Sequence, residues 1–293
     1  PLTLLGISKD TEIAVVEMGA NHIGEIAALC EIAMPTHGLI TNIGKAHLEG
    51  FGSFEGVIKA KTELYSYLRI KDGFVFVNAD DPVLMEKASD LKKTTYGSDD
   101  MADTKVRISK SKPVLAIAWN KHLLSSNLYG TYNFQNIAAA ICIGNTFGVE
   151  EKAIIQAIAD YTPQNSRSQL IKTKSNTIYL DAYNANPTSM YLALEDFIEQ
   201  ESPNKCLILG DMLELGKVAE EEHHKLANYV KDQFEHIILV GPEMVKAGRE
   251  QNLNVFPDTD SASHYLKEHP VVNADILIKG SRGIALERLL KYL

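Results

Sequence analysis

The chain has 293 residues, 45% of them hydrophobic and 23% charged, which is typical of a globular protein with more than one domain. Its 38 acidic residues outnumber the 29 basic ones, so the net charge of −9 argues against nucleic acid as a partner. The longest apolar runs, such as Ile237–Val240, fall far short of the roughly 20 residues that a bilayer-spanning helix requires.

The first part of the chain alternates β-branched runs with helix-length periodic segments, which is typical of a parallel sheet built from βαβ units. Strands are predicted over Glu12–Met18, Gly38–Ile43 and Phe74–Asn78. Helices are predicted over Gly24–Met34 and Phe54–Leu68, with Ser53 as the N-cap of the second.

Short alternating runs follow between Thr94 and Tyr129, separated by turn-forming residues, and they favour antiparallel strands at a sheet margin. These runs are Lys105–Ser109, Val114–Trp119 and Ser126–Tyr129. Two helices are then predicted over Asn133–Phe147 and Glu150–Tyr161, with a break at Gly148.

The polar, proline-containing segment Thr162–Ser168 is predicted to be an interdomain linker. After it, strands alternate with helices in the pattern of a doubly wound domain. The strands are predicted at Thr177–Leu180, Cys206–Leu209, Ile237–Val240 and Asp275–Ile278. The chain is therefore predicted to hold two α/β domains, residues 1–165 and residues 166–293.

Polar residues follow each predicted strand of the second domain, where ligands of open α/β sheets gather. They are Asp181–Pro187, Gly210–Met212, Gly241–Pro242 and Lys279–Gly283. The last segment places a lysine, an arginine and free backbone N–H groups at a helix start, which suits a carboxylate or a phosphate. On spacing alone, an ordinary strand-to-helix turn with solvated charges remains the alternative.

The first domain repeats this arrangement, with Glu17 after one strand and His47 after the next. A carboxylate oxygen and a neutral imidazole nitrogen are both possible ligands of a divalent cation. By themselves, however, this pair and the helical Lys61 are more simply interpreted as structural and surface residues.

Six ordered segments resemble the Mur ligases, and the resemblance extends over nearly the whole chain. They are Glu17–Ala20, Thr41–Glu49, Lys59–Lys61, Asp181–Pro187, Leu209–Gly216 and Lys279–Arg282. The resemblance implies an α/β protein: a partial central ATPase domain with a mostly parallel sheet, followed by a Rossmann-like, doubly wound carboxy-terminal ligase domain.

The implied reaction is ATP-driven amide formation, in which a carboxylate takes the γ-phosphoryl group and the resulting acyl phosphate is attacked by an amine. The strings DAYNANP and LGDMLELG most resemble those of the branch that joins D-alanyl-D-alanine to UDP-N-acetylmuramoyl-tripeptide. These two compounds are the expected substrates, and ATP and Mg²⁺ the expected cofactors. Diaminopimelate and lysine both remain open as the third residue of the tripeptide.

By the same resemblance, Glu17, His47 and Lys61 would hold magnesium, and His47 and Lys61 would serve catalysis. Lys61 would carry a carbamate, because a neutral lysine amine adds carbon dioxide and becomes an anionic oxygen ligand. Lys59 is the alternative in the same helix, although its register fits the family less well.

The resemblance also implies nucleotide contacts. Asn136 would face adenine, with Asn133 as a weaker candidate. Arg167 would reach the phosphates, Asp181 would meet the ribose, and Asn184 would lie near the γ-phosphate.

Substrate binding is assigned by the same resemblance to four residues of the second domain. Lys279, Ser281 and Arg282 would receive the peptide or dipeptide carboxylate, and Asn186 belongs to the same set.

The sequence departs from the family in one respect, since it contains no GxxxxGK[ST] phosphate-binding loop. In the family that loop and a uridine-nucleotide domain precede the position of Pro1. We therefore expect an amino-terminally truncated chain with little or no ligase activity by itself. Cys30, Cys142 and Cys206 lie far apart in apolar contexts, which indicates reduced thiols and a cytoplasmic protein. A monomer is the working expectation.

Two other interpretations remain. Another Mur ligase or a folylpolyglutamate-type ligase would share Glu17, His47 and Lys61 but differ in the second domain. A non-catalytic nucleotide-binding or interaction module would merely retain the fold, and a solvent-facing Lys61 far from Glu17 and His47 would favour it.

Overall fold

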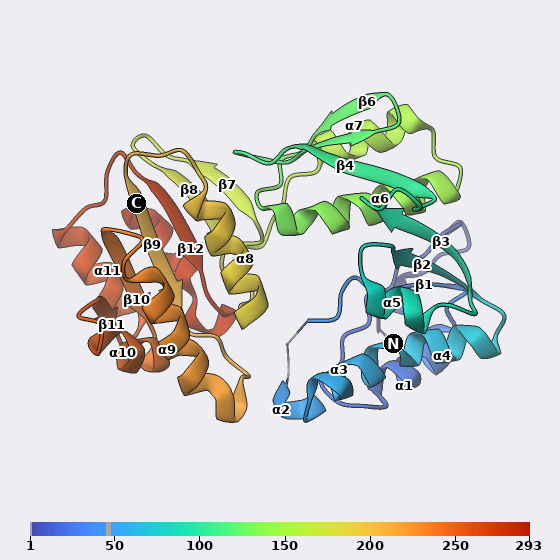
Figure 1. Ribbon diagram of the computed structural model, residues 1–293, viewed down its shortest axis with the longest axis horizontal. Helices are drawn as coiled ribbons and strands as arrows, with labels where there is room; N and C mark the ends of the chain where they lie inside the picture. The colour runs from blue at the N-terminus through green and yellow to red at the C-terminus, as the bar shows by residue number, and fades with distance from the viewer. Residues whose placement is uncertain (1, 45–47) are drawn as a thin grey trace. The chain divides into compact units, whose positions relative to one another are not determined.

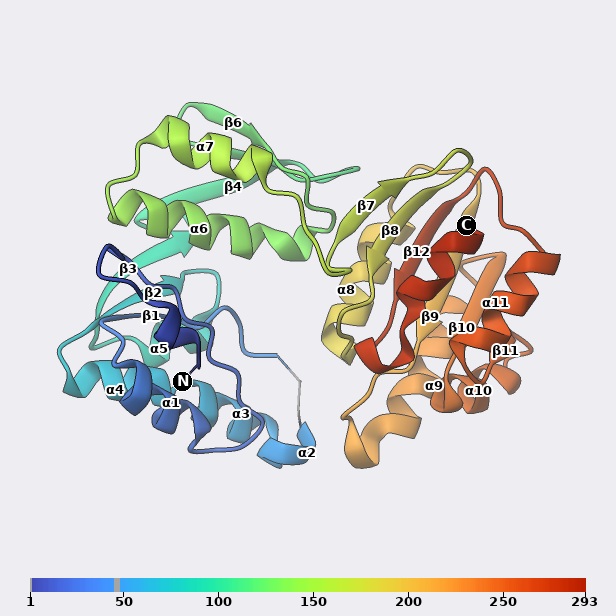
Figure 2. The ribbon, with the colours of Figure 1, turned by 180° about the vertical axis from the view of Figure 1, so that it is seen from behind.

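The computed structural model describes residues 2–44 and 48–293, and it is an α/β protein with two six-stranded, mostly parallel sheets. This confirms the predicted fold class. The chain forms two compact units (Figures 1 and 2). The first contains Pro1–Val106 and Gln135–Glu150, and the second contains Arg107–Phe134 and Glu151–Leu293. The predicted domain boundary between residues 165 and 166 stays a prediction.

The first sheet has the strand order β1-β2-β3-β4-β5-β6, and its first four strands pair in parallel. These strands are β1 (His37–Leu39), β2 (Phe74–Asn78), β3 (Lys92–Gly97) and β4 (Thr104–Lys110). The helical elements of this part are η1 (Leu2–Gly6), α1 (Glu25–Ala33), α2 (Leu48–Phe51), α3 (Phe54–Lys61), α4 (Glu63–Ile70), α5 (Pro82–Lys87) and α6 (Phe134–Thr146). Alternate β2 residues Val75 and Val77 are buried with Cys30 of α1 and Leu68 of α4, so the helices cover an apolar sheet face.

The second unit begins with an antiparallel hairpin formed by β5 (Ala116–Trp119) and β6 (His122–Ser125). The short helix η2 (Thr131–Asn133) follows, and α7 (Glu151–Asp160) packs on β6. The second sheet has the order β11-β10-β9-β12-β8-β7, and only its edge strand β7 runs antiparallel to its neighbour.

The strands of this sheet are β7 (Gln169–Lys172), β8 (Thr177–Asp181), β9 (Lys205–Gly210), β10 (His236–Val240), β11 (Asn254–Phe256) and β12 (Asp275–Lys279). The helices are α8 (Pro187–Ile198), η3 (Gly216–Val218), α9 (Ala219–Val230), α10 (Pro242–Arg249), α11 (Thr259–Glu268), η4 (Arg282–Ile284) and η5 (Leu286–Tyr292). Successive β9 residues enter different cores: Leu207 packs with α8 and α9, and Ile208 packs with α11 and η5. Apolar helices on both faces make this a doubly wound domain, as predicted.

The predicted strand at Glu12–Met18 is wrong, because this stretch is assigned no strand. Its alternating apolar side chains are exposed, with Val15 at 91% and Ile13 at 56%, and they gain nothing from a buried sheet face. The strand predicted at Gly38–Ile43 is also shorter, since regular pairing ends at Leu39.

The helix predicted over Phe54–Leu68 is divided at Thr62 into α3 and α4. The Thr62 hydroxyl donates to the carbonyl oxygen of Ile58 at 2.8 Å, a side-chain bond that competes with regular helix geometry. The predicted N-cap is confirmed, because Ser53 Oγ accepts from the backbone N–H of Gly56 at 3.1 Å.

Two predictions in the margin region need correction. The run at Lys105–Ser109 is a strand, but it pairs in parallel with β3. The strand predicted at Ser126–Tyr129 lies earlier, at β6. Ser126 Oγ donates to the carbonyl oxygen of Leu115 at 2.9 Å and accepts from the N–H of Leu128, which interrupts the regular ladder.

Candidate functional site

Two segments that neighbour predicted magnesium ligands pack against α3, the helix that ends at the predicted ligand Lys61. Ala20, three residues after Glu17, packs against a small core of α2 and α3 residues that includes Val57 and Ala60. Ile43, in the loop after β1, packs against the same core. The helix against which Ala20 and Ile43 pack ends at Lys61, so burial of apolar side chains draws these segments together.

Lys61 is half-buried, and its Nζ donates to the backbone carbonyl oxygen of Asn42 at 2.7 Å. Burial lowers the pKa of the Lys61 amine, because a charged ammonium is poorly solvated there. Glu17 lies in the extended stretch before α1 and is exposed, and His47 lies outside the described residues. In the ranges that the structure describes, no three His, Cys, Asp or Glu side chains form a metal cluster. The magnesium assignment therefore stays a prediction.

Glu63, which was not a predicted site residue, fixes the start of α1. Its two carboxylate oxygens accept from the backbone N–H groups of Gly24, at 2.6 Å, and Ala27, at 2.9 Å. A carboxylate at a helix start satisfies unpaired N–H groups and complements the helix dipole. Because the donors lie more than 35 residues away along the chain, no local sequence signal indicates this cap.

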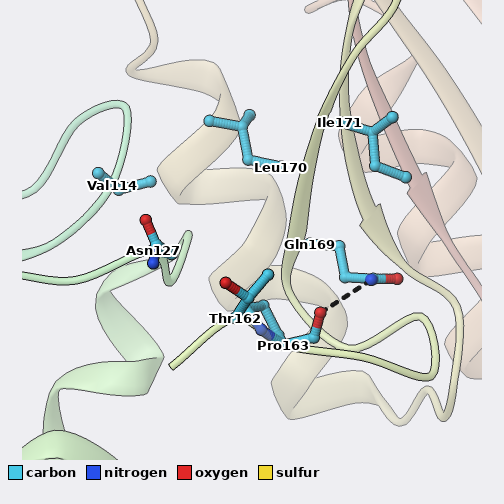
Figure 3. A pocket seen from close by; sticks show the side chains of 7 residues that line it. All are labelled: Val114, Asn127, Thr162, Pro163, Gln169, Leu170 and Ile171. Atoms are coloured by element: carbon cyan, nitrogen blue, oxygen red, sulfur yellow. Dashed lines mark hydrogen bonds between the residues drawn. The ribbon is translucent and has the colours of Figure 1, made fainter. Parts of the chain in front are cut away.

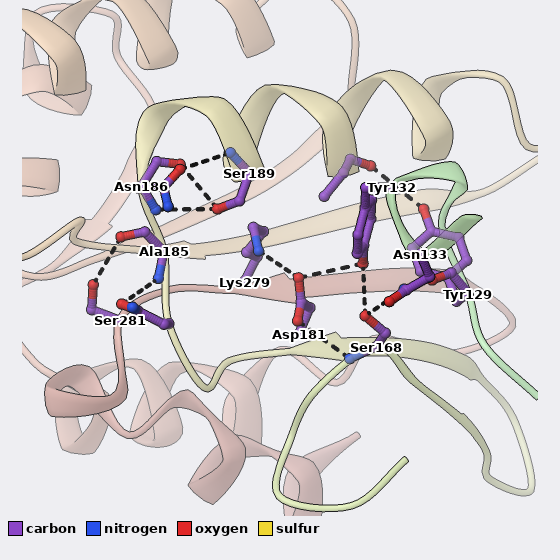
Figure 4. Close-up of polar contacts among 12 residues, drawn as sticks. Tyr129, Tyr132, Asn133, Ser168, Asp181, Ala185, Asn186, Ser189, Lys279 and Ser281 are labelled. Atoms are coloured by element: carbon purple, nitrogen blue, oxygen red, sulfur yellow. Dashed lines mark hydrogen bonds and ion pairs between the residues drawn. The ribbon is translucent and has the colours of Figure 1, made fainter. Parts of the chain in front are cut away.

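A buried ion pair joins two predicted site residues at the carboxyl edge of the second sheet. Asp181 and Lys279 are direct partners on the neighbouring strands β8 and β12, and Lys279 Nζ donates to Asp181 Oδ2. Lys279 is only 1% exposed. Asp181 also accepts from the Ser168 N–H at 3.2 Å and from the Tyr132 hydroxyl at 3.4 Å (Figure 4). The carboxylate thus has donors on both oxygens.

The two predicted adenine-facing asparagines occupy different environments. Asn133 is buried in η2, and its side-chain nitrogen donates to the Tyr129 carbonyl oxygen at 2.7 Å and to Ser168 Oγ at 3.0 Å. Asn136 is exposed on α6, about one turn further along the chain. Asn133 therefore stabilises the local fold, whereas Asn136 has a side chain accessible to solvent.

The asparagines of the DAYNANP string mainly shape its backbone. Asn186 is the N-cap of α8 and forms a reciprocal capping box with Ser189 (Figure 4). Asn184 is exposed, and its Oδ1 accepts from the backbone N–H of Ala185 at 2.9 Å.

Ser281, in the turn after β12, contacts the turns after β9 and β8. It is 3% exposed, and its Oγ accepts from the N–H of Leu213 at 2.9 Å and lies 3.5 Å from the carbonyl oxygen of Ala185. The structure thus brings together the turns after β8, β9 and β12, as expected for the carboxyl edge of a parallel sheet.

Arg167 and Arg282 both lie against the ring of Tyr183. The Arg167 Cζ is 3.8 Å from the ring centroid and the Arg282 Cζ is 5.3 Å from it. Both arginines are exposed, and the ring is half-buried. The structure therefore brings two predicted anion-binding residues to Tyr183, which was not a predicted site residue.

Asp211 and His223 stabilise the same sheet edge, although neither was a predicted site residue. Asp211 is 2% exposed and accepts from the N–H groups of Glu243, at 3.1 Å, and Met244, at 2.8 Å, at the start of α10. The buried His223 ring accepts from the Met212 N–H through Nε2 and donates to the Ala219 carbonyl through Nδ1. These contacts fix the Gly-Asp-Met turn after β9. In the sequence, only the position of an acidic residue directly after a predicted strand pointed to this turn.

A separate cavity of about 200 Å³ lies in the second unit (Figure 3). Its walls come from the loops beside β5 and β6, the predicted linker and β7. The lining residues are Val114, Asn127, Thr162, Pro163, Gln169, Leu170 and Ile171. Because none of them is a predicted site residue, this cavity is distinct from the polar sheet edge.

Comparison with known proteins identifies the family. Residues 1–144 match the Mur ligase middle domain, and residues 166–282 match the Mur ligase, glutamate ligase domain. The UDP-N-acetylmuramoyl-tripeptide--D-alanyl-D-alanine ligase of Escherichia coli is 30% identical, over 100% of this chain and 68% of the relative. The chain belongs to the Mur ligase family. Mur ligases are ATP-dependent amide ligases that act in peptidoglycan synthesis.

Other relatives agree with this assignment. The ligase of the same name from Bacillus subtilis is 34% identical over 100% of this chain and 66% of its own length, so the chain spans just under two thirds of that relative. A crystal structure of MurF from Thermotoga maritima in complex with ADP has a TM-score of 0.83 and 25% identity, covering 99% of this chain and 69% of that one. Among the described residues, every helix is too short or too polar to cross a membrane.

Proposed function

We propose that this chain is the larger part of an ATP-dependent ligase that joins D-alanyl-D-alanine to UDP-N-acetylmuramoyl-tripeptide. The observation that carries the proposal is the similarity to ligases of that name over the full length of the chain. The DAYNANP and LGDMLELG strings fall within this matched length and form turns at the polar sheet edge.

Glu17, His47 and Lys61 are the residues that would hold Mg²⁺. The described part of the chain fits this role, because the segment after Glu17, the loop before His47 and the end of α3 converge. Burial lowers the pKa of the Lys61 amine, and its hydrogen bond goes to a neutral carbonyl rather than to a carboxylate. Both features suit a lysine that loses its proton and adds carbon dioxide. When bound, Mg²⁺ would neutralise charge on the transferring phosphoryl group.

The second unit would position the reactants. Lys279 holds Asp181 through their ion pair and is nearly inaccessible, so we assign it to orienting the Asp181 carboxylate. Asp181 Oδ1, which accepts only the 3.2 Å bond from Ser168 in the described contacts, would accept a ribose hydroxyl. The exposed Arg167 and Arg282 would bind an anionic group of the reactants, a phosphate or the dipeptide carboxylate, since guanidinium groups match both anions.

The decisive experiment measures phosphate release with ATP, the tripeptide nucleotide and D-alanyl-D-alanine. Both this chain and the upstream-extended gene product are assayed. We expect activity from the extended product and little or none from this chain, which contains no GxxxxGK[ST] loop. Activity with a different amino acid, such as D-glutamate, would favour another Mur ligase, and inactivity of the extended product with every Mur substrate would refute the assignment.

A second experiment tests the role of Lys61 directly. The chain is equilibrated with ¹³C-labelled bicarbonate and examined by ¹³C NMR for a carbamate signal, which Lys61→Arg should abolish. Lys59→Arg is the matched control and should retain the signal. Loss of the signal in Lys59→Arg alone would move the carbamate to that neighbouring residue.

A further inference from the structure

Tyr183 occupies the centre of a cluster formed by three separate segments. The tyrosine lies in the turn after β8, Arg167 comes from the segment before β7, and Arg282 opens η4 after β12. Two guanidinium groups repel each other, so their approach to one ring requires a group that attracts both. An aromatic face attracts a guanidinium through its quadrupole.

The backbone around Arg167 is held in an unusual conformation. Ser166 and Ser168, on either side of it, have φ values of 58° and 47°, in the left-handed region that non-glycine residues rarely adopt. Hydrogen bonds hold this segment, from the Ala182 N–H to the Ser166 carbonyl at 2.8 Å and from the Ser168 N–H to Asp181. Such strain persists only where the surroundings impose it, and it is common at functional sites. The fold therefore directs Arg167 towards Tyr183.

We propose that Tyr183 is a positioning residue that seats Arg167 and Arg282 side by side, so that the two guanidinium groups form a single site for an oxyanion. The inference deepens the proposed function and rests on it for the identity of the ligand. That ligand is a phosphoryl or a carboxylate group of a reactant, because both present a pair of oxygen atoms that can accept two hydrogen bonds from a guanidinium.

Electrostatics supports this arrangement. The neighbouring Arg167 guanidinium, and after it the charge of Arg282, lower the pKa of the Tyr183 phenol, since both arginines favour the phenolate. A merely structural tyrosine on an apolar surface would lack this signature. Tyr183 thus provides a spectroscopic probe of its own contacts.

The first test is a phenolate titration followed by ultraviolet absorbance at 295 nm. The wild-type curve minus the Tyr183→Phe curve isolates Tyr183, which we expect to titrate below its ordinary value of 10.0. In an Arg167→Gln background, the same difference should move to higher pH. An unchanged Tyr183 titration after Arg167→Gln would overturn the proposed contact.

The second test measures anion binding to this chain by calorimetry at low salt, with inorganic pyrophosphate and with D-alanyl-D-alanine as separate probes. Tyr183→Phe keeps the ring and should retain the affinity, whereas Tyr183→Leu should weaken it about two- to fivefold. Arg167→Gln should weaken it at least as much. Tyr161→Leu, which alters an exposed tyrosine of the same unit, is the control and should have no effect.

The pattern of results separates the possibilities. Weakening for pyrophosphate alone identifies a phosphoryl site, and weakening for the dipeptide alone identifies a carboxylate site; both support the inference. Full affinity in a folded Tyr183→Leu variant, or no binding of either probe to the wild type, overturns it. Failure of the ligase assay with a positive titration would remove the proposed function and leave the Tyr183 cluster intact.

Discussion

Lys61 and Lys279 each end a regular element, yet their amines meet different partners. Lys279 is 1% exposed and forms an ion pair with Asp181, whose second oxygen is bonded to the backbone of Ser168. Lys61 is half-buried and donates to the neutral carbonyl oxygen of Asn42. The first lysine belongs to an internally paired network that fixes geometry, whereas the second is a partly desolvated amine whose hydrogen bond goes to a neutral group.

The comparison extends to the carboxylates. Asp181 and Asp211 are buried at the sheet edge, where a lysine or two helix N–H groups satisfy them. Asp196 of α8 is also buried, but its hydrogen bonds come from the backbone N–H and the hydroxyl of Thr131. A buried carboxylate whose donors come from one neutral residue is held less firmly than one with a charged partner or with N–H groups at the positive end of a helix. Four substitutions test this distinction.

The largest effect is expected for Lys279→Met. Removing one partner of a buried ion pair leaves the Asp181 charge uncompensated, so the free energy of unfolding should fall by about 3–5 kcal/mol. Urea unfolding followed by the fluorescence of Trp119, the single tryptophan and a residue of the same unit, measures it. The double variant Asp181→Asn/Lys279→Met should recover part of the loss. A change below about 1 kcal/mol would show that the pair does not hold the edge.

Asp211→Ala should have a smaller effect, because it removes a helix cap rather than a charge pair. We expect a loss of about 1–2 kcal/mol in the free energy of unfolding. Asp258, which caps α11 through the Ser261 N–H, is exposed and provides the matched control. Asp258→Ala should cost less than Asp211→Ala in the same urea experiment, and the reverse order would contradict the assigned importance of the buried cap.

The buried carboxyl of Asp196 should make the free energy of unfolding depend on pH. Burial raises the pKa of its carboxyl above the ordinary value of 3.8, against the opposing hydrogen bonds from Thr131. The folded chain therefore binds the Asp196 proton more tightly than the unfolded chain does. The stability that this proton binding contributes is fully present below pH 3.8, and it is lost as the pH rises through the folded pKa. Wild type should lose on the order of 1 kcal/mol relative to Asp196→Asn across that window.

Urea unfolding of both proteins at a series of pH values measures this difference, in which the titration of all other carboxylates largely cancels. A difference that stays constant would show that the Thr131 hydrogen bonds offset burial, and a change in the opposite direction would show that they outweigh it.

The smallest effect is expected for Lys61→Met. Methionine keeps most of the buried chain length and removes one neutral hydrogen bond, so the stability should change by less than about 1 kcal/mol. Far-ultraviolet circular dichroism during urea unfolding is the appropriate measurement, because Trp119 belongs to the other unit. A loss as large as that of Lys279→Met would mean that Lys61 is a structural residue like its counterpart.

Local sequence patterns determined most regular elements of this protein. Phe74–Asn78 was predicted with its observed bounds, and Asp275–Ile278 differs from β12 by one residue. Buried strands of a parallel sheet are continuous apolar runs, and Ser53 is a strong capping residue, so both can be recognised without tertiary information. The ordered motifs likewise indicated the family, which the comparisons confirmed.

Tertiary contacts decided the rest. Val15 and its neighbours have strand propensity, but a strand requires a pairing partner and a face to bury. Glu63 caps a helix that begins far away in the sequence, and Asp181 meets Lys279 only because β8 and β12 are neighbours in the sheet. The sequence shows which chemical groups are present, but strand order and helix packing determine which of them meet. For that reason the partners of Lys61, Tyr183 and Lys279 became visible only in the folded chain.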